Sequence, residues 1–227
     1  MKRFLPFILI ALVGLLTVGI ATAVYRVKTR PKPASTASTA AARATPEEEA
    51  ENPSLHVRGP KNAPVTLEIY GDFQCPSCAV ASREIDELQA QEFAGKMRVV
   101  FHEFPLAMHR HAAQAARAAE AAGLQGKFWE MHDALYKYQD VWSRANNAND
   151  FFESYAEAIG LDVARFRADC ISPDVLTRVM EDGKAGEERG VKNTPTFFLN
   201  GDQVTTAFTK EALQQVIESA LSAKKGP

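Results

Sequence analysis

The residues of this chain with the clearest capacity for chemistry are two cysteines separated by two residues. They are Cys75 and Cys78, in the stretch GDFQCPSC at residues 71–78. Such a pair can form half of a zinc site, close a structural disulfide, or exchange electrons with other thiols by cycling between dithiol and disulfide. The rest of the sequence must distinguish these three possibilities.

A zinc site is the weaker possibility because it needs four ligands. Besides the pair, the chain has only Cys170 and five histidines, and it has no second Cys-x-x-Cys. His109 and His111 are two positions apart, so in a helix they would face different directions. We therefore predict no metal and no other cofactor. A buried core position is the default for Cys170, because free cysteine is among the most buried residue types.

Redox chemistry fits the position of the pair, which follows an apolar run and precedes a helical pattern. At a helix N-terminus, free backbone N–H groups and the helix dipole stabilise an anion, which lowers the pKa of the Cys75 thiol below its usual ~8.5. We therefore predict that Cys75 is the exposed nucleophile, whereas Cys78, one turn later, faces the protein body as the resolving thiol. Pro76 suits the first helical turn, where its missing N–H costs nothing. Ser77 brings no positive charge, so we expect a milder oxidant than a pair with a basic residue there.

The elements that must position the pair follow from sequence periodicity. Residues 64–70 and 97–104 are rich in β-branched and aromatic residues and predict two strands. Apolar residues at helical spacing over residues 75–93 predict a helix between them. The unit is therefore β-α-β, with parallel strands joined by a right-handed crossover.

Helical patterns dominate from residue 109 to about residue 190, and strand character then returns. Asn200-Gly201 predicts a hairpin between the stretches TFFL and QVTT, and a last helix has Thr209 as its N-cap. We predict an α/β fold, a thioredoxin-like sheet with an all-helical insertion at 107–188, within a domain that covers 57–223.

The first 25 residues predict a signal peptide or a signal anchor. Lys2 and Arg3 precede an uncharged run at 4–24, long enough to cross a bilayer core. That length favours an anchor, whereas the Ala-Thr-Ala motif at 21–23 favours cleavage. Basic residues after the run outnumber those before it, which argues for a cytosolic C-terminal part. We give more weight to the redox pair, which fits an oxidising compartment.

Residues 26–56 predict a disordered linker. The segment is rich in Pro, Ala, Ser, Thr and charge, and it has few side chains large enough to form a core. The whole chain of 227 residues has a formal net charge of -2. It lacks the basic excess that attracts phosphate, so we expect no nucleic-acid partner.

Three motifs together resemble the exported DsbA-like thiol:disulfide oxidoreductases, which have a thioredoxin fold with a helical insertion. The motifs are GDFQCPSC, GKFWEMHDALY and GVKNTPTFFLNG, and the resemblance covers residues 58–222. It implies that Thr194-Pro195 is a cis peptide beside the cysteines, where the Thr194 backbone can pair with a substrate strand. It also implies an enzyme that introduces disulfides into proteins with cysteines.

The resemblance further implies a place in the bacterial cell envelope, on the periplasmic side of the cytoplasmic membrane, with residues 4–24 as the anchor. A quinone-linked membrane oxidase would then reoxidise the pair. Two alternatives stay open. One is a disulfide reductase or isomerase kept reduced by a membrane electron donor. The other is a non-enzymatic peptide-binding chaperone.

One position departs from the family pattern. Family members often carry a buried acid six positions before the nucleophile, which resembles a proton relay for the resolving thiol. In this chain that position is Ile69, and the acid is Glu68. Strand side chains alternate between faces, so Glu68 should point away from Cys78 unless a bulge shifts the register. The proton acceptor for Cys78 is therefore solvent, or Glu68 through a bulge.

Overall fold

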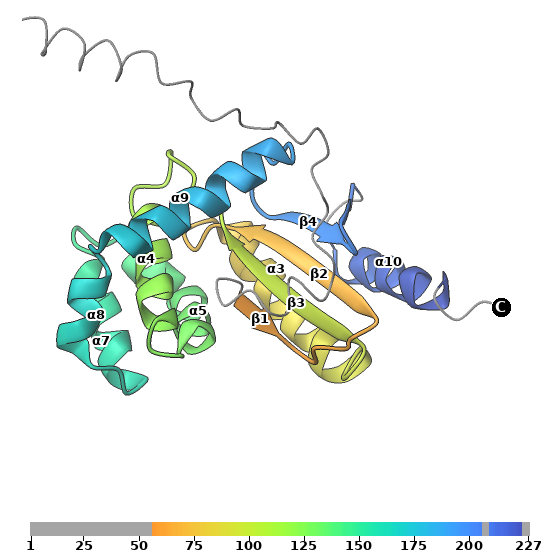
Figure 1. The fold of residues 1–227 in the computed structure, drawn as a ribbon, viewed down its shortest axis with the longest axis horizontal. Helices are drawn as coiled ribbons and strands as arrows, with labels where there is room; N and C mark the ends of the chain where they lie inside the picture. Colours follow the sequence, from red (N-terminus) through yellow and green to blue (C-terminus); the bar gives the residue numbers. More distant parts are fainter. Residues whose placement is uncertain (1–55, 206–208, 224–227) are drawn as a thin grey trace, which may run out of the picture. The chain divides into compact units, whose positions relative to one another are not determined.

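The structure is a computed structural model that describes residues 56–205 and 209–223. These residues form a five-stranded sheet with the strand order β1-β3-β2-β4-β5 (Figure 1). These residues lie within the unit Arg43–Pro227. The strands are β1 (His56–Arg58), β2 (Val65–Gly71), β3 (Met97–Glu103), β4 (Thr196–Leu199) and β5 (Asp202–Gln203). The helices are α3 (Pro76–Glu87), the π-helical turn η1 (Leu88–Glu92), α4 (Ala112–Gly123), α5 (Phe128–Lys137), α6 (Gln139–Trp142), α7 (Asn149–Ala158), α8 (Val163–Asp169), α9 (Pro173–Glu188) and α10 (Lys210–Ala223).

The predicted β-α-β unit is confirmed. Strands β2 and β3 are parallel, and their pairing runs without a bulge from Val65 opposite Met97 to Gly71 opposite Glu103. Helix α3 connects them, so the carboxyl ends of both strands meet at the edge of the sheet where α3 begins. The chain thus has the predicted α/β thioredoxin-like fold, with helices inserted between β3 and β4.

The predicted hairpin is also present, because β4 and β5 are antiparallel neighbours. Asn200 and Gly201 connect them with φ angles of 50° and 85°, the left-handed backbone that Asn-Gly turns favour. The second arm is shorter than predicted, since β5 contains only Asp202–Gln203.

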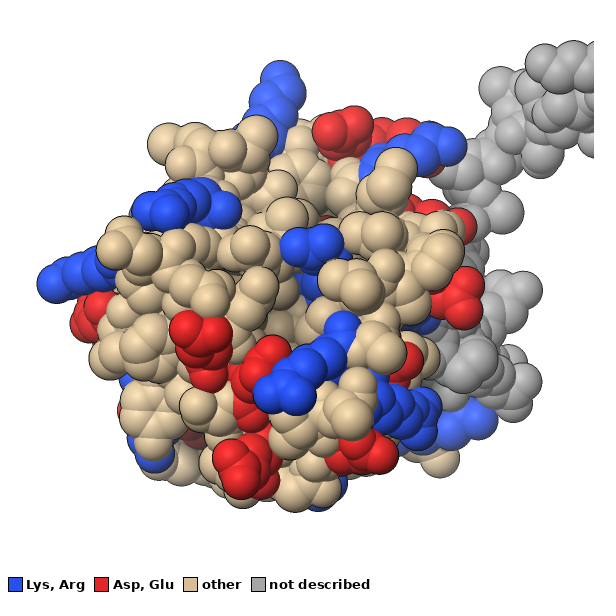
Figure 2. Space-filling view, turned by 90° about the vertical axis from the view of Figure 1, so that its left-hand side faces the viewer, with Lys and Arg blue, Asp and Glu red and all other residues tan. Residues whose placement is uncertain are grey.

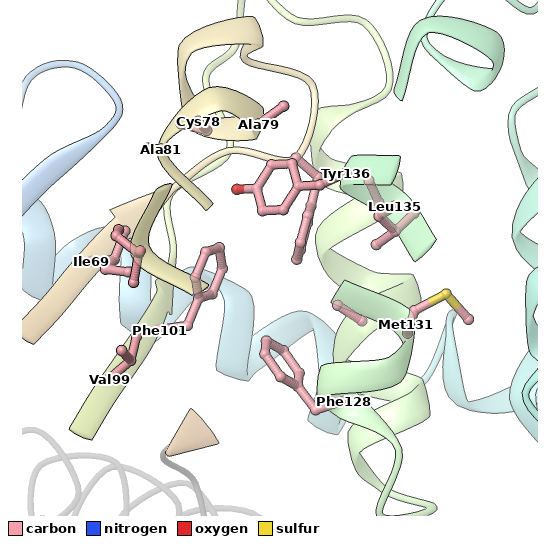
Figure 3. Packing of buried hydrophobic residues seen from close by; sticks show 14 of the residues in the cluster. Ile69, Cys78, Ala79, Ala81, Val99, Phe101, Phe128, Met131, Leu135 and Tyr136 are labelled. Carbon is pink, nitrogen blue, oxygen red and sulfur yellow. The ribbon is translucent and has the colours of Figure 1, made fainter. Parts of the chain in front are cut away.

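The sheet has a different set of neighbours on each face. Val65, Leu67 and Ile69 of β2 point into the main core with residues of α3, α5 and α10. Figure 3 shows the side chains of Ile69 and Phe101 facing those of α5. Tyr70 points to the opposite face, where α9 packs. This alternation places successive residues of β2 in different environments.

Three differences from the sequence-based prediction concern short or terminal pieces. Strand β1 and helix α6 were not predicted, because three or four residues are too few to show a periodicity. Helix α3 ends at Glu87, and the chain continues in η1, where the Phe93 N–H donates to the Leu88 carbonyl oxygen at 2.8 Å. This wider turn keeps Phe93 buried.

The predicted anchor at 4–24 lies outside the described residues. So does the predicted linker at 26–56, apart from His56, which begins β1 and is therefore part of the fold. Within the described part of the chain, no helix combines the length and the apolar character needed to cross a membrane.

Candidate active site

Cys75 occupies the N-cap of α3, and the helix begins at Pro76, as the sequence predicts. The backbone N–H of Cys78 donates to the Cys75 carbonyl oxygen at 3.1 Å, which closes the first turn. Both cysteines are free thiols and both are buried, with exposed fractions of 6% for Cys75 and 3% for Cys78. Cys75 is therefore more covered than the exposed nucleophile that we predicted.

The cover of Cys75 comes from two sides. The Cys75 sulfur lies 3.2 Å from the Ser77 hydroxyl oxygen and 3.4 Å from the Thr194 carbonyl oxygen. The Thr194-Pro195 peptide is cis, as the family resemblance implies. The loop before β4 thus lies against the start of α3, and all six residues of the predicted site gather there: Cys75, Pro76, Ser77, Cys78, Thr194 and Pro195.

Hydrogen bonds make Cys75 an acidic thiol. The Cys78 thiol is the largest influence, and together with the side chains of Ser77 and Thr194 it outweighs burial and lowers the pKa of Cys75 to about 4. The buried Thr194 hydroxyl has no hydrogen-bond partner among the described residues, which leaves its proton available to the thiolate. Cys75 is therefore ionised at neutral pH when the pair is reduced.

Cys78 is the opposite kind of thiol. It lies in a chamber lined by Ile69, Phe101, His132 and Tyr136 among others. Burial raises the pKa of Cys78 far above its ordinary value, and the neighbouring Cys75 thiolate raises it further. The reduced pair is thus one thiolate and one thiol.

Asp72 holds the loop between β2 and α3, a role that the sequence analysis missed. Its fully buried carboxylate accepts the backbone N–H groups of Gln74 at 2.7 Å and Leu106 at 2.9 Å, and it contacts His109 Nδ1 at 2.7 Å. Loop residues with Asp or Asn often bond the backbone two residues later, so the bond to Gln74 was foreseeable. The contacts to Leu106 and His109 depend on the tertiary fold.

Gln139 is a second positioning residue that the sequence did not reveal. It is buried in α6, and its Nε2 group donates to the carbonyl oxygens of Phe73 at 2.7 Å and Cys75 at 2.9 Å. The helical insertion therefore contributes directly to the cysteine loop.

Glu68 does not reach Cys78, as strand alternation predicts. Arg189 donates to both of its carboxylate oxygens, and His102 Nε2 lies 3.5 Å away. Burial would raise the pKa of Glu68, but His102 and Arg189 lower it to about 2. The carboxylate is a structural ion pair on the face of the sheet opposite Ile69, and the regular register of β2 leaves no bulge to turn it.

The remaining candidates lie away from this chemistry. Cys170 is half-buried at the C-terminus of α8 and packs against the main core, and burial raises its pKa to about 12. His111 is buried, with its ring bonded to Gln114 and to the Ala145 carbonyl oxygen. Within residues 56–205 and 209–223, no three His, Cys, Asp or Glu side chains gather as metal ligands.

Comparisons with solved structures show the same fold. A thioredoxin-like oxidoreductase from Silicibacter pomeroyi DSS-3 superposes with a TM-score of 0.66 at 25% identity, over 81% of this chain and 100% of that one. BdbD from Bacillus subtilis gives 0.67 at 22% identity, over 74% and 94%. Alpha-DsbA1 from Wolbachia pipientis gives 0.65 at 18% identity, over 75% and 94%.

Curated relatives match the same part of the chain. The Na(+)/H(+) antiporter NhaA 1 of Salinispora arenicola is 41% identical over 168 residues, which are 74% of this chain and 25% of that protein. The antiporter NhaA of Herminiimonas arsenicoxydans is 38% identical over 165 residues, 73% and 25%. This chain thus spans about a quarter of the length of the curated relatives it matches.

A family model described as thioredoxin matches residues 51–219, which include the cysteine pair, the helical insertion and the loop with the cis peptide. The solved structures that share this fold include a DsbA protein. The chain belongs to this thioredoxin family and has a DsbA-like thioredoxin fold.

Proposed function

We propose that this protein is a thiol:disulfide oxidoreductase that introduces disulfides into protein substrates through Cys75 and Cys78. The observation that carries the proposal is the position of Cys75 at the start of α3, where its sulfur lies 3.2 Å from the Ser77 hydroxyl and 3.4 Å from the carbonyl oxygen of the cis Thr194-Pro195 peptide. In this position the pKa of Cys75 is lowered to about 4, whereas burial raises that of Cys78. Whatever stabilises the thiolate stabilises the reduced pair, which makes the disulfide form a stronger oxidant. Ser77 brings no positive charge, which favours a milder oxidant, and its hydroxyl lies 3.2 Å from the Cys75 sulfur, where it helps to lower the pKa of Cys75.

In the oxidised protein, a substrate thiolate attacks the Cys75 sulfur. A bond forms between the two sulfurs, the Cys75–Cys78 bond breaks, and its electron pair goes to the Cys78 sulfur. A second substrate thiolate then attacks the mixed disulfide and displaces Cys75 as a thiolate. The substrate loses two electrons to the pair, and Cys75 is a good leaving group because its thiolate is stabilised.

Thr194 and Pro195 form the substrate edge in this proposal. The loop that carries them precedes β4 and lies against the Cys75 sulfur, so an extended substrate segment bonded to the Thr194 backbone would place its cysteine next to Cys75. Backbone pairing with an extended segment is independent of side-chain sequence, which suits an enzyme with many substrates.

The proposed location is the bacterial cell envelope, outside the cytoplasmic membrane, with residues 4–24 as the anchor and a quinone-linked membrane oxidase as the partner that reoxidises the pair. The apolar run and the exported character of the resembled family support this location.

On the face shown in Figure 2, basic and acidic side chains are interspersed. This face has no continuous basic patch that would attract the phosphate backbone of a nucleic acid.

The test is a pair of measurements on the full chain in detergent. Equilibration with glutathione gives the reduction potential, and a reduced two-cysteine peptide serves as the substrate. We expect a reduction potential near ~-120 mV and oxidation of the peptide. Cys75→Ser should show neither the redox transition nor peptide oxidation, and Cys170→Ser should show both. A potential near ~-270 mV without peptide oxidation would instead identify a reductase.

A further inference from the structure

Departure of Cys78 requires a proton, and this requirement follows from the proposed exchange activity. A thiol with a strongly raised pKa is a poor leaving group as a bare thiolate, and burial raises the pKa of Cys78. Ile69 occupies the strand position where a family member often has an acid, and Glu68 is bound to Arg189 on the other face. Solvent has little access to Cys78, whose exposed fraction is 3%, so an acid on another element is the candidate to serve it.

Glu103 is a fully buried acid without a structural role that accounts for it. It is the last residue of β3 and lies directly opposite Gly71 at the active-site end of the sheet. Its exposed fraction is 0%, and neither carboxylate oxygen has a hydrogen-bond partner among the described residues. Alternation along β3 places its side chain on the same face as Phe101, which lines the chamber of Cys78.

The surroundings of Glu103 keep its carboxyl group protonated. Burial raises the pKa of Glu103 well above its usual range, and the nearby charge of Glu120 raises it further. Glu120 is itself bound to His56 and Arg178. Five titratable or charged side chains face Glu103 from the β2–α3 loop, α4, α5 and α9: Asp72, Glu120, Tyr136, Arg178 and Asp182.

Tyr136 lies on the same face of the sheet as Cys78 and the side chain of Glu103. It is buried, it lines the same chamber as Cys78, and Figure 3 shows its ring reaching from α5 toward α3. Its hydroxyl oxygen lies only 3.1 Å from the position that a Cβ atom on Gly71 would occupy, and Gly71 is the residue opposite Glu103. Burial raises the pKa of Tyr136, and Tyr136 and Cys78 line the same chamber.

We infer that Glu103 stores the proton that Cys78 takes up when it leaves, and that the Tyr136 hydroxyl passes this proton between them. As the Cys75–Cys78 bond breaks, the Tyr136 O–H proton goes to the Cys78 sulfur and the Glu103 carboxyl proton goes to the Tyr136 oxygen. Tyr136 is then neutral again, and Glu103 is a carboxylate, which regains a proton from solvent. In the reverse direction Glu103 first loses its proton to solvent, and the carboxylate then accepts the Cys78 proton through Tyr136.

The experiment measures the rate at which dithiothreitol reduces the oxidised full chain between about pH 5 and 9. Samples are quenched with acid, alkylated and analysed by mass spectrometry. Each rate constant is divided by the fraction of dithiothreitol that is ionised at that pH, which removes the pH dependence of the reductant itself. We expect Glu103→Gln, which keeps the shape but cannot supply the proton, to slow this step about tenfold or more and to change its pH profile, as loss of a general acid does. Tyr136→Phe should give the same loss, and the double variant should add no more.

The matched control is Glu68→Gln, the same substitution of a buried strand glutamate on the opposite face, which should keep the wild-type rate and profile. A Glu103→Gln protein with the wild-type pH profile would overturn the inference, and so would a Tyr136→Phe protein with the wild-type rate. If Glu103→Gln does not fold, Tyr136→Phe alone decides. Dithiothreitol reduction needs no protein substrate, so it still reports on Glu103 if the peptide-oxidation assay fails.

Discussion

The Cys75 sulfur and the Thr194 carbonyl oxygen lie 3.4 Å apart, although 119 positions separate the two residues in the chain. The sheet creates this proximity, because β2 leads into Cys75 and pairs antiparallel with β4, which follows Thr194. The reactive sulfur and the proposed substrate edge are therefore set by one pair of adjacent strands. Changes on either side of the contact should alter the redox properties of the pair.

Replacement of Thr194 by valine should make the pair less oxidising. The variant keeps the shape of the side chain but removes the hydroxyl that is available to the Cys75 thiolate. Loss of one hydrogen bond to a charged group should raise the pKa of Cys75 by about one unit and make the reduction potential ~30 mV more negative. Thiolate absorbance and equilibration with glutathione measure the two effects. Thr177→Val, an exposed change in α9, should cause neither, and an unchanged Cys75 pKa in Thr194→Val would contradict the assignment.

Alkylation should distinguish the three thiols of the reduced protein. At about pH 6, Cys75 is ionised because its pKa is about 4, whereas burial raises the pKa of Cys170 to about 12 and that of Cys78 still further. Iodoacetamide should therefore modify Cys75 first, and the rate should fall as the pH falls through 4. Peptide mass spectrometry reads the sites. Comparable modification of Cys170 at this pH, or labelling that survives Cys75→Ser, would argue against this order of acidity.

Removal of the Gln139 amide should destabilise the cysteine loop. Gln139→Leu leaves the buried carbonyl oxygen of Phe73 without the Gln139 donor, whereas the Cys75 carbonyl oxygen keeps the N–H of Cys78. An unsatisfied buried group costs about 1 to 3 kcal/mol. We expect the free energy of unfolding in urea to fall by about 2 kcal/mol or more. Gln215→Leu, at an exposed position of α10, is the control and should change it by less than about 0.5 kcal/mol. Equal effects of the two changes would mean that Gln139 does not hold the loop.

Substitution by alanine should change the free energy of unfolding in opposite directions at two glycines of α9. A Cβ atom on Gly186 would lie 2.8 Å from ring atoms of Phe104 and 2.9 Å from Tyr70, whereas a Cβ atom on Gly183 would have nothing within 4 Å. Gly186→Ala should therefore lower the free energy of unfolding by about 1 to 3 kcal/mol. Gly183→Ala should raise it by up to about 1 kcal/mol, because alanine is the better helix former. Urea unfolding of the two variants side by side checks the signs, and a stable Gly186→Ala protein would contradict the close packing of α9 on the sheet.

Local features of the sequence were enough to predict the elements that carry the pair. Cys75 at the start of a helix follows from the change of period between residues 64–70 and 75–93, and Pro76 agrees with a first helical turn. Asn200-Gly201 likewise predicts its hairpin from two adjacent residues. Alternation along β2 also predicts that Glu68 and Ile69 face opposite sides. In each case the interactions that decide the structure lie within a few residues of one another.

By itself, then, the sequence determined the α/β order of elements, the cysteine pair at a helix start and the face that Glu68 occupies. Only the tertiary structure decided how far Cys75 is covered, that Gln139 bonds the cysteine loop, and that the Glu103 carboxyl group is buried with no hydrogen-bond partner among the described residues. Those properties depend on contacts between residues far apart in the chain. Burial and hydrogen bonding in turn set the pKa values of both cysteines, because the cost of a charge depends on every group that surrounds it.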